Sequence, residues 1–72
     1  MRFKDLREDR DLYQKDIAEL LEMTQAHYSR IELGIYQLSY EKLKKLALFY
    51  NTSIDYILGL TNIKEPYPRK KR

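Results

Sequence analysis

The sequence predicts one all-α domain built from five short helices. Apolar residues recur at intervals of three and four positions in five separate stretches, which is the spacing of helices with one buried face. Residues that suit helix caps or turns stand between these stretches. The chain has 72 residues and no cysteine, so its length suits one domain, and neither a disulfide nor a thiolate metal site is available to hold it together.

The first two helices are expected in residues 2–9 and from Gln14 onward. An apolar face at helical spacing defines each of them: Phe3 and Leu6 in the first, then Ile17, Ala18 and Leu21 in the second. The charged residues 9–11 interrupt the pattern between them. Asp16 falls in the first turn of the second helix, where a carboxylate suits the helix dipole.

A third helix is predicted directly after a tight break at residues 22–23. Thr24 suits its N-cap, because the hydroxyl accepts a bond from a free backbone N–H. Gly34 stands where a left-handed residue commonly ends a helix. The inward face carries Tyr28 and Ile31. Two helices joined by so short a turn cannot lie antiparallel, so residues 14–34 are expected to cross steeply as a helix-turn-helix.

Two further helices complete the predicted bundle. Ser39 and Ser53 are good N-caps, each with an acidic residue in the turn that follows. The inward faces carry Leu43, Leu46, Ala47 and Tyr50 in the fourth helix, and Ile54, Ile57 and Leu58 in the fifth. Gly59 is expected to end the last helix.

The pattern resembles the helix-turn-helix of the lambdoid-repressor and Cro-like family, often called the XRE family. The resemblance covers roughly residues 3–60. It is carried by Leu6, Arg7, Gln14, Ile17, Ala18, Leu21, Met23, Thr24, Gln25, Ser29, Arg30, Ile31, Glu32 and Gly34, and by Leu43, Leu46, Ala47, Tyr50, Ser53, Ile54, Asp55, Ile57 and Leu58. It implies a five-helix bundle like the lambda-repressor DNA-binding domain. It also implies sequence-specific binding of double-stranded DNA by a transcriptional regulator that acts as a repressor.

The resemblance also implies roles for individual residues. The recognition helix, residues 24–33, would enter the major groove and present Gln25, Ala26 and Arg30 to base edges. The alternative for these three residues is that they have no binding role and form an ordinary solvated helix face. The other candidate DNA-contacting residues are Gln14, Thr24, His27, Ser29, Tyr36 and Gln37. Among them Gln14 would hold a phosphate, and His27 would lie near the DNA backbone or simply be exposed.

Three further features concern the scaffold around this helix. The family's counterparts of Arg7 and Glu32 form an ion pair between the first helix and the end of the recognition helix. Glu22 stands in the turn where the family commonly has glycine, so a positive φ there would cost about 1 kcal/mol. The loop after Gly34 lacks the family's usual lysine, arginine and proline, so we expect weaker nonspecific affinity for DNA.

The charge is divided unevenly along the chain. Residues 1–62, the expected DNA-binding domain, hold nine basic and ten acidic side chains, a net of −1. Residues 63–72, expected to form an extended or disordered tail, hold five basic residues and one acidic residue, a net of +4. The basic pI therefore supports nucleic-acid binding only weakly. A basic tail could bind phosphates or only aid solubility.

Two alternatives to a simple repressor follow from these observations. One is an antitoxin that binds DNA and neutralises a toxin. The other is a protein–protein interaction module without DNA binding, which the net charge of residues 1–62 favours.

A homodimer through the last helix and its approach, residues 54–60, is expected because so small a domain contacts few base pairs. No catalytic set, metal cluster, cofactor site or membrane-spanning run can be assembled from the sequence, and the absence of cysteine fits a cytoplasmic setting.

Overall fold

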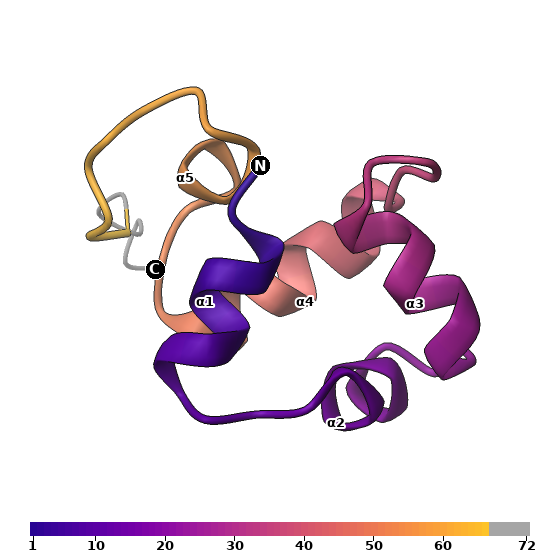
Figure 1. Cartoon of the computed structure of the whole chain (residues 1–72). Coiled ribbons are helices and arrows are strands. Elements are labelled where there is room, and N and C mark those ends of the chain that lie inside the picture. The colour runs from indigo at the N-terminus through magenta and orange to yellow at the C-terminus, as the bar shows by residue number, and fades with distance from the viewer. Residues whose placement is uncertain (67–72) are drawn as a thin grey trace, which may run out of the picture.

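A computed structural model describes residues 1–66 and contains five helices, with no strand among those residues. The helices are α1 (Phe3–Asp9), α2 (Gln14–Leu20), α3 (Gln25–Glu32), α4 (Tyr40–Tyr50) and α5 (Ile54–Leu58). Figure 1 shows α4 behind the middle of the molecule, with α1 and α5 on one side and α2 and α3 on the other. The predicted all-α, five-helix fold is confirmed.

The predicted caps form at three helix starts. The hydroxyls of Thr24, Ser39 and Ser53 each accept a hydrogen bond from the backbone N–H three residues on. These bonds satisfy amide groups that the first helical turn leaves without a partner. Gly34 and Gly59 both have a positive φ, 83° and 82°, as expected of residues that end helices.

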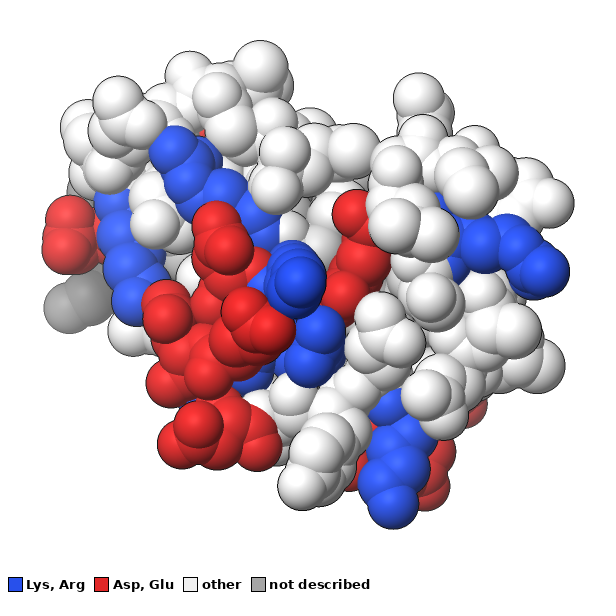
Figure 2. Space-filling view, in the orientation of Figure 1, with Lys and Arg blue, Asp and Glu red and all other residues white. Residues whose placement is uncertain are grey.

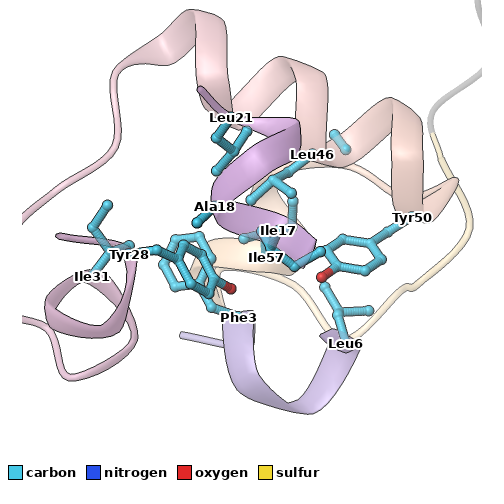
Figure 3. Close-up of a cluster of buried hydrophobic side chains, with 11 residues drawn as sticks. Phe3, Leu6, Ile17, Ala18, Leu21, Tyr28, Ile31, Leu46, Tyr50 and Ile57 are labelled. Carbon is cyan, nitrogen blue, oxygen red and sulfur yellow. The ribbon is translucent and has the colours of Figure 1, made fainter. Parts of the chain in front are cut away.

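All five helices contribute to one apolar core. Figure 3 shows side chains from the inward faces of the helices meeting in a single cluster. The buried members are Phe3, Leu6, Ile17, Ala18, Leu21, Tyr28, Ile31, Leu46, Ala47, Tyr50 and Ile57. Tyr28 and Ile31 anchor α3 in this core, so the opposite face of the recognition helix is directed outward.

The turn between α2 and α3 is short and partly left-handed. Glu22 has a φ of 58°, the conformation that the family's glycine would suit better. The Met23 N–H bonds to the carbonyl oxygen of Ala18, and the Lys42 ammonium of α4 donates to the carbonyl oxygen of Leu21. These bonds close the end of α2 and fasten the turn to α4.

The two ends of the described chain are tied to α5 and its surroundings. The Arg2 N–H bonds to the Ile57 carbonyl oxygen at 2.7 Å, and the Arg2 guanidinium donates to the carbonyl oxygens of Tyr56 and Thr61. The Thr52 hydroxyl, between α4 and α5, donates to the carbonyl oxygen of Lys64 and holds the backbone at that residue beside the turn. The expected boundary at residue 62 stays a prediction, and residues 67–72 of the expected tail lie outside the described residues.

Within residues 1–66, none of the helices is both long enough and apolar enough to span a bilayer.

Candidate nucleic-acid interface

The outward face of α3 brings several predicted DNA-contacting residues together. Thr24, Gln25, Ala26 and Arg30 are exposed, while His27 and Ser29 are partly buried on the same helix. Within residues 1–66, the side chains of Gln25 and Arg30 make no hydrogen bond or ion pair to another residue. The Thr24 hydroxyl is occupied as a cap and accepts the His27 N–H at 3.1 Å. Two long polar side chains are therefore available on the exposed face of this helix.

The loop after α3 folds back toward the recognition helix. The backbone N–H groups of Ile35 and Tyr36 both donate to the Arg30 carbonyl oxygen, at 2.9 and 3.5 Å. The rings of His27 and Tyr36 stack, with centroids 5.1 Å apart and planes inclined by 16°. Both residues were candidate DNA contacts, but sequence reasoning missed the contact between them, because the turn at Gly34 separates them along the chain.

A bidentate ion pair joins α1 to the end of α3. The Arg7 Nε and Nη2 atoms donate to the two Glu32 carboxylate oxygens at 2.7 and 3.1 Å. The Arg7 Nη1 atom also donates to the Leu12 carbonyl oxygen at 2.9 Å. The side chains are 11% and 5% exposed, so water screens this pair poorly. The structure thus pairs the two residues that the resemblance suggested.

The protonation equilibria of the pair follow from this geometry. The hydrogen bond to Glu32 raises the pKa of Arg7 above its ordinary value, against the effect of burial. Burial alone would raise the pKa of Glu32, but hydrogen bonds from Arg7 and Gln14 outweigh it, and that pKa is lowered. Both groups are therefore held in their charged forms.

Gln14 takes part in the same cluster. Its Nε2 atom donates to a Glu32 carboxylate oxygen at 3.0 Å, so the side chain connects the start of α2 to the end of α3. The family resemblance implies a phosphate contact for Gln14, and that contact stays a prediction. The bond to Glu32 lies outside any local pattern, since the two residues are 18 positions apart.

The acidic surface is concentrated away from the recognition helix. Figure 2 shows acidic side chains gathered over α1 and the turn that follows it. The exposed acidic residues of this segment are Asp5, Glu8, Asp9 and Asp11. On α3 itself, Arg30 is exposed, whereas the charge of Glu32 is compensated by Arg7. The net −1 of residues 1–62 therefore does not make the exposed face of α3 acidic.

The comparisons with known proteins agree with this geometry. The helix-turn-helix family model matches residues 3–57. The chain belongs to the XRE/Cro/C1-type helix-turn-helix family. An uncharacterized HTH-type transcriptional regulator of Bacillus subtilis (strain 168), YobD, is 33% identical over 70 residues. That match covers 97% of this chain and 62% of the relative, so the chain spans about three-fifths of the relative's length. No solved structure gave a significant match.

Membership in the XRE/Cro/C1-type family covers nearly all the helical elements described above. The family is one of DNA-binding transcription regulators. The matched region begins with α1 and ends within α5, so it includes the helix-turn-helix and the core that supports it.

Proposed function

We propose that this protein is a transcriptional repressor that binds a specific sequence of double-stranded DNA in the cytoplasm, with α3 in the major groove. The observation that carries the proposal is the exposed face of α3, where Gln25 and Arg30 have no partner among residues 1–66. Repression would follow if the bound protein covers a promoter.

The side chains on this face suit base recognition. An arginine can bond guanine through two hydrogen bonds, a glutamine can do so with adenine, and an alanine methyl suits the thymine methyl. We therefore assign Gln25, Ala26 and Arg30 to base edges. The Arg7–Glu32 pair supports this assignment, because it fixes the end of α3 to α1 and so restricts the tilt of the helix.

Phosphate contacts would flank the base contacts. Gln14 lies at the start of α2, and Gln37 lies in the exposed loop beyond α3. Thr24 and Ser29 complete this set from α3 and its cap, and His27 and Tyr36 adjoin it. Phosphate contacts orient a protein on the duplex but carry no sequence information directly. Because few cations surround α3, hydrogen bonds would supply most of these contacts.

We further propose a homodimer through the last helix and its approach, residues 54–60. The side chains of α5 are themselves partly or fully buried, but Leu60 is 73% exposed directly after it. Ile63, 61% exposed, extends this apolar surface along the chain. A two-fold dimer would place two recognition helices on one symmetric site.

The test is selection of bound sequences from a random pool of duplex DNA. We expect enrichment of a two-fold symmetric site, and a mobility shift with DNA from upstream of the protein's own gene. Light scattering of the bound complex would give two protein chains per duplex. No enriched sequence and no shift would overturn the proposed function.

A protein–protein interaction module is the second candidate, because acidic side chains gather over α1 in Figure 2. Failure of the selection, together with capture of a protein partner that Asp9→Asn and Asp11→Asn weaken, would favour this module. The antitoxin alternative predicts DNA binding as well, and a co-transcribed toxin that the protein neutralises would distinguish it from a simple repressor.

A further inference from the structure

We propose that Tyr36 is a positioning residue, whose ring stacks on His27 and holds the loop of residues 34–37 in the conformation that meets a DNA phosphate. The inference rests on the proposed function and goes beyond it. It assigns the role to the ring of Tyr36 rather than to its hydroxyl, and it makes His27 the platform for the loop rather than a DNA contact.

Four contacts hold the loop to α3. Three are backbone bonds at the C-terminal end of the helix: the Gly34 N–H donates to the Ile31 carbonyl oxygen, and those of Ile35 and Tyr36 donate to the Arg30 carbonyl oxygen. The fourth is the His27–Tyr36 stack, which reaches the first turn of the helix. The bond from Tyr36 to Arg30 is 3.5 Å long, so the stack supplies the firmer constraint at this residue. The backbone of His27 is fixed, because its backbone N–H donates to the Thr24 hydroxyl.

The stack lies at the surface and not in the core. Tyr36 is 46% exposed, and neither ring belongs to the buried cluster. The near-parallel rings have the separation of a favourable aromatic pair. Removing one ring therefore loosens the loop without opening a cavity among the core side chains.

The composition of the loop makes its order important for binding. Residues 34–38 contain no lysine or arginine, so no side-chain charge in the loop attracts a phosphate. The backbone N–H groups of Gln37 and Leu38, which make no backbone hydrogen bond within residues 1–66, and the Gln37 amide must supply hydrogen bonds instead. Such contacts are worth less when a mobile loop has to be ordered during binding, because the lost conformational entropy opposes association. A loop already held by the stack avoids that loss.

The experiment compares Tyr36→Phe, Tyr36→Ala, His27→Ala and the double Ala variant on one selected duplex and on a mismatched duplex. Dissociation constants would be measured by fluorescence anisotropy at one salt concentration. Tyr36→Phe keeps the ring and should bind within about twofold of the unmodified protein. Each single Ala variant should lose roughly two- to tenfold on both duplexes, and the double variant no more than either single one. Tyr40→Ala is the matched control, because Tyr40 is 68% exposed just beyond the loop.

Two binding outcomes would overturn the inference. An equal loss in Tyr36→Phe and Tyr36→Ala would mean that the hydroxyl binds DNA directly. Additive losses in the double variant would mean that the two rings act independently.

A second measurement needs no DNA. Nitrogen-15 relaxation of the free protein should show greater motion of the amides of residues 35–37 in His27→Ala, with those of α1 and α4 unchanged. Unchanged loop motion would overturn the positioning role. If the unmodified protein binds no duplex, the proposed function fails, while this measurement still decides whether the stack orders the loop.

Discussion

Replacing Arg7 by methionine would remove one partner of the ion pair between α1 and α3 and leave the other in place. The Glu32 side chain is 5% exposed, so its carboxylate would stay out of water with only the Gln14 hydrogen bond remaining. The Leu12 carbonyl oxygen would also lose the bond it accepts from Arg7. Breaking one side of such a buried pair typically costs about 3–5 kcal/mol, against about 0–1 kcal/mol for a surface pair.

Because the Gln14 hydrogen bond to Glu32 is retained, we expect the free energy of unfolding to fall by an amount near the lower end of this range, about 3 kcal/mol. Small domains are stable by only about 5–15 kcal/mol, so this is a large share of the total. At roughly 4–8 °C per kcal/mol for a domain of this size, the melting temperature should fall by about 12–24 °C. Lys4→Met is the matched control, because it removes an exposed cation from the same helix and should change stability by less than about 0.5 kcal/mol.

The pH dependence distinguishes an unpaired buried charge from a simple loss of packing. In the unmodified protein the lowered pKa of Glu32 gives stability that is present above its ordinary value of 4.5 and is lost as the pH falls through the folded-state pKa. Without Arg7, burial should raise the pKa of Glu32 instead. Acidification would then relieve the unpaired charge, so the stability gap between the two proteins should narrow between pH 7 and pH 5.

Urea unfolding followed by circular dichroism would measure both effects. A cycle that adds Glu32→Gln and the double variant isolates the coupling between the two side chains. A loss below about 1 kcal/mol, or a cycle without coupling, would refute the reasoning. A gap that does not change with pH would refute the buried-charge explanation.

Four further predictions concern the turn, the interface and the tail. Glu22→Gly should raise the free energy of unfolding by about 1 kcal/mol, because φ is 58° there; urea unfolding that shows no gain would contradict this. Arg30→Ala should weaken discrimination at one base pair by about 1–3 kcal/mol in the duplex selection, and a uniform loss that keeps the same ranked sites would reject its base contact. Gln14→Ala should weaken binding to all duplexes alike, whereas a changed ranking would argue against a phosphate contact. Deleting residues 67–72 removes four cations and should flatten the slope of log affinity against log salt by about 0.9 per lost phosphate contact; an unchanged slope would assign them another role.

The helices and their ends could be predicted from the sequence because the interactions that define them are local. Apolar spacing depends on neighbours three and four positions apart, and a cap such as Thr24 bonds to a residue three positions on. The positive φ of Gly34 likewise follows from the end of one helix. The pairing of Arg7 with Glu32, 25 positions apart, was suggested by the family resemblance and not by any local pattern.

The remaining long-range contacts were decided by how the helices and loops pack together. Gln14 meets Glu32 because the packing of α2 against α3 brings the start of one near the end of the other. His27 meets Tyr36 because the left-handed Gly34 turns the loop back along α3. Arg2 reaches Thr61 because the N-terminus lies against α5. The sequence alone does not indicate which partner each of these side chains meets. The packing of the core determines which residue lies within bonding distance.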